Sequence, residues 1–186
     1  MAALPHSKLR HLGVFAFNPA ELSKFYQRWF SLVVSDHGIG STGHEVIFMT
    51  GDAQEHHQIA FANGRQPEWP GMNQISFLVD SLEELKRLAI AFKEAGVTIL
   101  QQKDHGNTWS LYVEDPEGNR IEIYTPSPWY VSQPIWWPMD LLTESEETIR
   151  ERTRKSAQAS PGFMTRDAWM TQTQARIDAL RNANPI

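Results

Sequence analysis

The sequence of 186 residues contains no cysteine. Disulfide frameworks, zinc–thiolate sites, iron–sulfur clusters and thiol nucleophiles are therefore excluded, and any metal must be held by imidazole, carboxylate or amide groups. Positive charge is also in short supply, because 17 lysines and arginines stand against 22 acidic residues and leave a net charge of −5. This mixed, acidic balance argues against a nucleic-acid-binding protein, whose domains usually carry a basic stripe.

Long apolar runs are absent as well. No stretch approaches the roughly 18 residues that a membrane span needs, and the first residues lack the apolar segment of a secretory signal. We therefore expect a cytoplasmic protein without a membrane partner. At roughly 100–200 residues per domain, the length predicts one folding unit or two small units built alike.

An internal repeat organises the first two thirds of the chain. Residues of about 8–64 and 71–126 each read as one strand, one helix and three further strands, in the same order. Each unit would cover one sheet face with its helix, so the two opposite faces should enclose a cavity between the units. The sequence therefore predicts an α+β fold in which two tandem βαβββ modules form a half-open barrel.

Both helices of the repeat carry start signals. In the first module Asn18 stands just before Pro19, and apolar residues within 22–30 recur on one helical face. In the second module Asp80, with Glu83 three residues later, is expected to cap the helix.

Strand parity selects the side chains that face the cavity, because successive residues of a strand point to opposite faces of a sheet. Polar residues alternate with apolar ones along the central strands, and the polar set lies on the face away from the helices. A carboxylate between two isoleucines, as in residues 121–123, is costly to bury unless it is paired or bound to a metal. The residues expected to share the concave surface are His11, Gln74, Tyr112 and Glu122.

With these residues the chain resembles the vicinal oxygen chelate superfamily, which includes glyoxalase I, antibiotic-resistance proteins and, most similar here, the type I extradiol ring-cleaving dioxygenases. The resemblance covers about residues 8–126, and its most specific part is YVEDPEGNRIEIY at 112–124. It implies one divalent metal per subunit, held by His11, Gln74 and Glu122. The dioxygenase pattern has a histidine where this chain has Gln74, a weaker donor, so Fe(II) is expected first and Mn, Zn, Ni or Co stay possible.

Two further segments are similar to the dioxygenase branch. EHHQIAF at 55–61 resembles the segment with a non-ligating active-site histidine, which implies that His57 is an acid/base and that His56 is a solvated neighbour. DHGNTWSLYVEDPEGN at 104–119 resembles the stretch with an active-site tyrosine, here Tyr112. The residues expected to contact a planar aromatic substrate are His105, Asn107, Trp109 and Tyr124, with Phe15 and Phe17 as further cavity-lining aromatics.

The resemblance implies an enzyme that opens the ring of a catechol-like aromatic diol with O2. Chelation of two adjacent substrate oxygens would lower a hydroxyl pKa and orient the reactants, while His57 takes a proton. Two alternatives stay open. One is a glyoxalase- or epimerase-like metal enzyme that moves a proton beside a chelated carbonyl, which Gln74 favours; the other is a non-catalytic protein that binds aromatic ligands.

We divide the chain into a paired-module domain at residues 1–126 and an extension at 127–186. The extension begins with a Trp- and Pro-rich arm at 126–140, whose prolines exclude regular helix and central strand. Helices are expected at 143–158, from a Thr-x-x-Glu capping box, and at 165–182. We expect the arm to serve in packing or as a subunit contact of a homodimer or larger homo-oligomer, with a lid over the cavity as the alternative.

Overall fold

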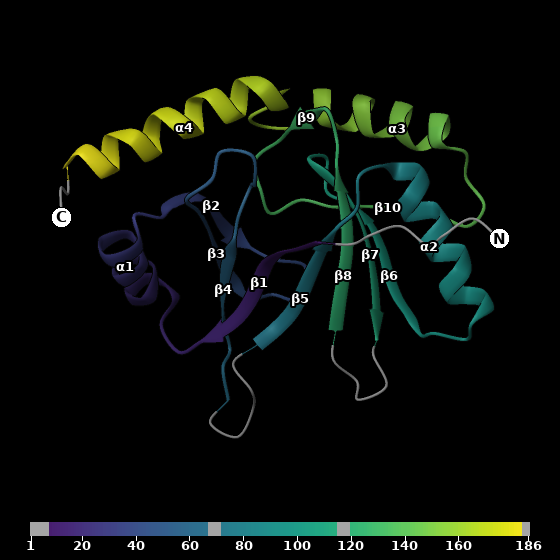
Figure 1. Ribbon diagram of the computed structural model, residues 1–186, viewed down its shortest axis with the longest axis horizontal. Coiled ribbons are helices and arrows are strands. Elements are labelled where there is room, and N and C mark those ends of the chain that lie inside the picture. The colour runs from purple at the N-terminus through teal and green to yellow at the C-terminus, as the bar shows by residue number, and fades with distance from the viewer. Residues whose placement is uncertain (1–7, 67–71, 115–119, 184–186) are drawn as a thin grey trace.

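A computed structural model describes residues 8–66, 72–114 and 120–183. These residues form an α+β fold with one curved nine-stranded sheet and four helices, which confirms the predicted fold class (Figure 1). The strands of the two modules are β1 (Lys8–Ala16), β2 (Val33–Ile39), β3 (Glu45–Thr50), β4 (Ile59–Asn63), β5 (Met72–Leu78), β6 (Ile99–Asp104), β7 (Thr108–Glu114) and β8 (Arg120–Pro126). The helices and shorter strands are α1 (Pro19–Phe30), α2 (Leu82–Glu94), α3 (Glu146–Gln158), α4 (Arg166–Ala183), β9 (Trp129–Tyr130), β10 (Trp137–Pro138) and β11 (Met164–Thr165).

The two modules join edge to edge. The strand order is β10-β6-β7-β8-β5-β1-β4-β3-β2, so each module supplies four neighbouring strands in equivalent order. In each module the first strand runs parallel to the last, and the two first strands, β1 and β5, pair antiparallel at the centre. This arrangement brings the first strands of both modules, with His11 and Gln74 on them, side by side.

The helix starts follow local capping chemistry, with two corrections to the predicted positions. The Asn18 side chain accepts the N–H of Glu21 at 3.1 Å, as expected for the cap of α1. Helix α2 is capped by Ser81 rather than Asp80, because its hydroxyl reaches the N–H of Glu84. Helix α3 begins only at Glu146, three residues later than predicted.

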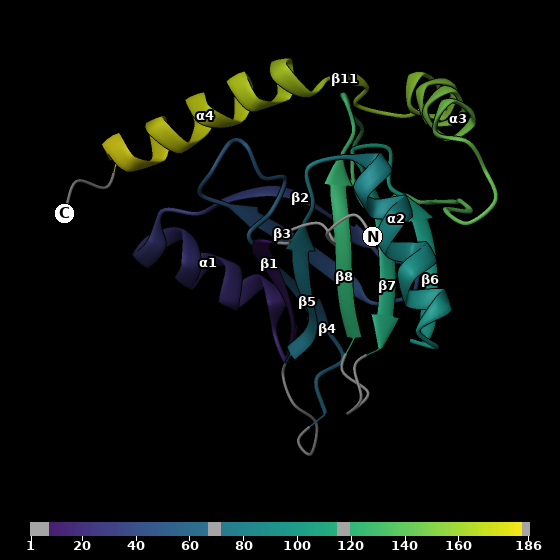
Figure 2. The same ribbon diagram turned by 45° about the vertical axis from the view of Figure 1, so that its right-hand side comes forward.

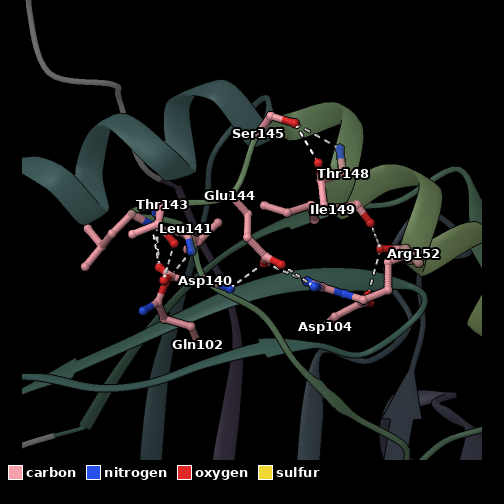
Figure 3. Close-up of polar contacts among 12 residues, drawn as sticks. Gln102, Asp104, Asp140, Leu141, Thr143, Glu144, Ser145, Thr148, Ile149 and Arg152 are labelled. Atoms are coloured by element: carbon pink, nitrogen blue, oxygen red, sulfur yellow. Dashed lines mark hydrogen bonds and ion pairs between the residues drawn. The ribbon is translucent and has the colours of Figure 1, made fainter.

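The capping box predicted for α3 is not used. Ser145 is the N-cap and accepts the N–H of Thr148, while the Thr143 hydroxyl donates to the Asp140 carboxylate at 2.5 Å instead. Figure 3 shows the segment from Asp140 to Ser145 that leads into α3. It also shows the ion pair between Glu144 of this segment and Arg152 of the helix.

Each module has a core beneath its own helix. Helix α2 packs on β7 and β8, where Leu85, Leu111 and Ile123 are buried. Helix α1 packs on β3 and β4, where Met49 and Phe61 are buried and Leu22 and Tyr26 cover them. For the other apolar residues that the sequence predicts on this helical face, within 22–30, the structure describes the backbone but not the side chains. The two helices flank the sheet at opposite ends (Figure 1).

The extension wraps one end of the sheet. Its arm is extended as expected: β10 pairs with β6 at the sheet edge, and β9 pairs with β11. Helices α3 and α4 then run along the same side of the molecule (Figures 1 and 2). Helix α4 contacts β2 through Ile177, which packs with Val33. None of the helices in the described ranges is long and apolar enough to cross a membrane.

Candidate metal centre

A cavity of about 180 Å³ opens on the concave face of the sheet. Both modules and the arm contribute to its lining. The sequence motif at residues 112–124 enters it through β7 and β8, although residues 115–119 of that motif lie outside the described part of the chain. The predicted cavity residues that line it are His11, His57, Gln74, His105, Asn107, Tyr112, Glu122 and Tyr124.

One oxygen of Glu122 is the point on which the predicted ligands converge. Its Oε2 lies 2.7 Å from Nε2 of His11, and it accepts the Gln74 amide at 2.9 Å and the Ser76 hydroxyl at 2.8 Å. Glu122 is only 4% exposed and His11 only 5%. The structure therefore brings together the side chains that parity assigned to the concave face, while their role as ligands stays a prediction.

Strand register explains this convergence. Ser76 on β5 is paired with His11 across β1 and with Glu122 across β8. His11 and Glu122 thus lie on the two strands that flank Ser76, and side chains at paired positions point to the same face. Gln74 is two residues from Ser76 on β5 and so shares that face.

The charge of this cluster is set by two opposing effects. Burial alone would raise the pKa of Glu122, but the charge and hydrogen bond of His11, together with His105 and Ser76, lower it far below its usual value. Glu122 is therefore a carboxylate with hydrogen-bond donors on both oxygens.

The donors fit a divalent metal ion. His11 offers an imidazole nitrogen, Glu122 a carboxylate oxygen, and Gln74 an amide oxygen once the amide turns over, and such donors suit Fe, Mn, Zn, Ni and Co ions. Within the described ranges, no three His, Cys, Asp or Glu side chains gather to hold a metal. The candidate third donor is the neutral amide of Gln74, a weaker donor than an imidazole.

Tyr112 contacts the second oxygen of the same carboxylate. Its hydroxyl donates to Oε1 of Glu122 at 2.8 Å, and Nε2 of His105 lies 3.1 Å from the phenol oxygen. Nδ1 of His105 lies 2.8 Å from the carbonyl oxygen of Ile135 in the arm. Burial, followed by the charge of Glu122, raises the pKa of Tyr112 well above its usual value, so the group remains a phenol.

His57 lies beside this cluster. Its ring centroid is 4.2 Å from that of His11 and 4.9 Å from that of Phe48. Burial, followed by the neighbouring His11 and His56, lowers the pKa of His57 well below its usual value. The prediction that His56 is a solvated neighbour is wrong: His56 is 8% exposed, because its ring stacks on Trp169 at 5.6 Å.

Asp36 on β2 orients both histidines. Its Oδ2 lies 2.9 Å from Nε2 of His56, and Nδ1 of His56 lies 2.9 Å from Nδ1 of His57. A carboxylate only accepts, so Nε2 of His56 donates, and in neutral His56 Nδ1 accepts the proton of Nδ1–H of His57. Nε2 of His57 is left with a free lone pair.

The arm completes the site. The Tyr130 hydroxyl and the backbone N–H of Gln133 donate to the same Asp36 oxygen at 2.6 Å and 3.1 Å, and residues 133–136 line the cavity. The arm therefore lies at the cavity, where the alternative of a lid had placed it, while its role in packing or as a subunit contact stays a prediction. Sequence reasoning missed Asp36 and its contacts with the arm, because these partners lie 94 and 97 residues apart; only the adjacent His56-His57 pair offered a signal.

Three of the aromatic assignments are wrong, those of Trp109, Phe17 and Phe15. Trp109 is 1% exposed and lies on the helix side of the sheet, where its indole donates to the Thr153 hydroxyl of α3 at 2.8 Å. Trp109 is two residues from the buried Leu111 on β7, so strand alternation places both on the packing face. Phe17 is 65% exposed and does not line the cavity.

Phe15 differs in outcome from the two remaining assignments. Phe15 contacts the His44 ring edge-on at 5.7 Å and also lies outside the cavity lining. Asn107 and Tyr124 do line the cavity. The Tyr124 hydroxyl donates to the buried Glu55 at 2.8 Å.

Known proteins share this fold and part of this sequence. A biphenyl-2,3-diol 1,2-dioxygenase 2 from Rhodococcus globerulus is 31% identical over 117 residues, which cover 59% of this chain and 60% of that protein. The 2,3-dioxygenase LapB from Pseudomonas sp. KL28 superposes with a TM-score of 0.56 at 24% identity, over 70% of this chain and 46% of LapB. A methylmalonyl-CoA epimerase from Mycobacterium tuberculosis superposes with a TM-score of 0.53 at 17% identity, over 69% of this chain and 94% of the epimerase.

The match spans less than two thirds of the length of the Rhodococcus protein, and the structural likenesses show the fold. A family model described as the Glyoxalase/Bleomycin resistance protein/Dioxygenase superfamily matches residues 8–123, well over half of the chain. The chain therefore belongs to the glyoxalase/bleomycin resistance protein/dioxygenase superfamily.

Proposed function

We propose that the protein is a metal-dependent extradiol dioxygenase that opens the ring of a catechol-like aromatic diol with O2. The observation that carries the proposal is the convergence of His11 and Gln74 on the Glu122 carboxylate, with His57 and Tyr112 in the same cavity. The likeness to a biphenyl-2,3-diol 1,2-dioxygenase supports this class.

The cavity supports a small aromatic substrate. Its volume of about 180 Å³ is close to the ~150 Å³ cavity that accommodates one benzene ring. Phe48, Tyr124 and Trp136 supply aromatic surface around the polar cluster. A single substituted ring, with its diol at Glu122, is the substrate that these dimensions favour.

The residues divide the chemistry between them. A divalent metal held by His11, Gln74 and Glu122 would chelate the two diol oxygens and lower the pKa of a substrate hydroxyl. His57 then serves as the general base. Its lowered pKa keeps the imidazole unprotonated, and its Nε2 carries the lone pair that accepts a proton. Tyr112 holds Glu122 in place through Oε1.

Ring cleavage after anaerobic Fe(II) loading tests the proposal. We expect O2 uptake and a yellow ring-fission product with at least one vicinal diol from a catechol panel. His57→Gln should lower kcat by about 10²–10⁴-fold, since general acid–base catalysis contributes that much. The matched control, His37→Gln, changes an exposed histidine of β2 and should leave kcat unchanged. No turnover with any vicinal diol would overturn the proposal.

A second candidate is a metal-dependent epimerase or lyase of the glyoxalase type. The amide of Gln74 favours it, because it takes the place of a second imidazole among the candidate ligands, and the fold likeness to an epimerase is consistent with it. It predicts proton transfer beside a chelated carbonyl with Zn²⁺, Ni²⁺ or Co²⁺ and no oxygen consumption. The same loading experiment, run with these ions and an oxygen electrode, separates the two candidates.

A further inference from the structure

Two cationic side chains flank the ring of Tyr112 in the cavity wall. Lys103 on β6 has its Nζ 5.6 Å from the centroid of the Tyr112 ring, and the Arg120 guanidinium on β8 lies 4.3 Å from the same centroid. Both line the cavity, and Lys103 is only 7% exposed. The cavity therefore carries two positive charges beside the carboxylate cluster.

Neither cation has an acidic partner among the described residues. Within the described ranges neither forms an ion pair: Lys103 donates to the Ser41 hydroxyl at 3.3 Å, and Arg120 donates to the Gln101 side chain at 3.0 Å. In the same part of the chain, the Nε of Arg120 is buried without an acceptor. Buried lysine and arginine are rare unless they are paired, because desolvation disfavours an isolated charge.

Glu122, the carboxylate whose charge acts on Lys103, is already engaged. Burial, followed by the charge of Arg120, lowers the pKa of Lys103, and the charge of Glu122 opposes this. Both oxygens of Glu122, however, are occupied by His11 and Tyr112 and their neighbours. An anion supplied from outside would offset the repulsion between Lys103 and Arg120 and would accept their spare N–H donors.

We propose that Lys103 and Arg120 bind an anionic substituent, a carboxylate, on the aromatic substrate. The inference rests on the proposed function, whose substrate class it narrows from any catechol to one with an acidic side chain. Lys103 lies between Ser41, which is exposed, and Trp136, which is 45% exposed and whose ring is 5.0 Å away. The carboxylate would thus lie toward the cavity mouth, and the diol would lie at the buried Glu122.

A matched ligand pair tests the charge requirement. We would measure binding of 3-(3,4-dihydroxyphenyl)propanoate and of its methyl ester to the full chain by calorimetry, without added metal. Two methylenes separate the carboxylate from the ring, so both ligands have nearly the same diol. The wild type should bind the acid at least about tenfold more tightly, because hydrogen bonds to charged groups contribute that much or more.

Variants show which side chains cause the tighter binding of the acid. Lys103→Met and Arg120→Met should each remove most of it by weakening the acid alone, and Lys103→Arg should retain it because the charge is kept. Lys93→Met changes an exposed lysine at the end of α2 and should behave as wild type. Circular dichroism checks that each variant is folded, and 3-phenylpropanoate against its amide repeats the test without a diol.

The outcomes separate this inference from the proposed function. Equal affinity of the wild type for acid and ester would overturn the inference, even if both were cleaved. A preference that persists in both Met variants would overturn it as well. A preference that depends on Lys103, found in a protein that cleaves no diol, would support the anion site while overturning the dioxygenase proposal.

Discussion

Nδ1 of His56 lies 2.9 Å from Nδ1 of His57, so the tautomer of one imidazole fixes the tautomer of the other. The Asp36 carboxylate at the far side of His56 decides between the two arrangements, because it accepts from Nε2. The hydrogen bonds that run from Asp36 through His56 to His57 therefore let the Asp36 carboxylate determine whether Nε2 of His57 carries a proton.

Asp36→Asn removes that determinant. The amide can offer an N–H to His56, which permits the opposite tautomers and places a proton on Nε2 of His57. We expect kcat for diol cleavage to fall about 10–100-fold, the range seen when such supporting residues are changed, with KM nearly unchanged. Asp178→Asn, an exposed change on α4, is the control. A rise in KM together with the fall in kcat, both tracking lost thermal stability, would indicate a structural role instead.

Gln74→His adds a second imidazole to the candidate metal ligands. Imidazole is a better donor than a neutral amide for Fe(II), so we expect at least about tenfold tighter Fe(II) binding, or about 1.4 kcal/mol, and faster ring cleavage. Competition with a chelating dye measures the affinity, and Gln172→His on the exposed face of α4 controls for an added histidine. Lost native activity with unchanged Fe(II) binding would mean that the amide is adapted to other chemistry.

Arg152→Gln should make stability depend less on pH. The Arg152 hydrogen bond holds the pKa of Glu144 below its usual value of 4.5, so the pair contributes stability above that pH and loses it as the pH falls through the lowered value. Because both side chains are partly exposed, we expect a cost of about 1 kcal/mol at pH 7. Urea unfolding should show this difference shrinking below about pH 4; a constant difference would contradict it.

Thr153→Val breaks the link between the sheet and α3. The Thr153 hydroxyl accepts from the Trp109 indole and lies 2.7 Å from the Asp104 carboxylate, all in the core. Leaving these buried groups unsatisfied should cost about 2–3 kcal/mol of unfolding free energy. Thr171→Val, on the exposed side of α4, should change it by less than about 0.5 kcal/mol. Equal effects of the two substitutions would rule out this role.

The central cluster can be predicted because it depends on two periodic features, the internal repeat and the alternation of side chains along each strand. The repeat aligns β1 with β5, and alternation along each strand then assigns His11, Gln74 and Glu122 to one face. The same alternation explains Trp109, which the sequence analysis assigned to the cavity. Counting alternate residues along β7 places Trp109 in the core, where it lies. These positions follow from local pattern alone.

The supporting residues are not predictable in this way. Asp36 meets His56 only because β2 and the loop before β4 close on each other, and it meets Tyr130 only because the arm returns across 94 residues of sequence. No periodic pattern encodes a contact between an irregular arm and a strand. The arm's role as a cavity wall follows from tertiary hydrogen bonds such as those to Asp36. The late start of α3, at Glu146, follows from local bonds that compete with the predicted capping box, because Thr143 donates to Asp140 and Ser145 caps the helix instead.

Metal binding by the full chain and by Glu122→Gln is the most direct test of the candidate centre. Elemental analysis and titration with Fe(II), Mn(II) and Zn(II) should find one divalent ion per wild-type chain. Binding should be strongly reduced when the carboxylate becomes an amide of the same shape. A wild-type chain that binds none of these ions, or a Glu122→Gln chain that binds them equally well, would contradict a metal centre built on His11, Gln74 and Glu122.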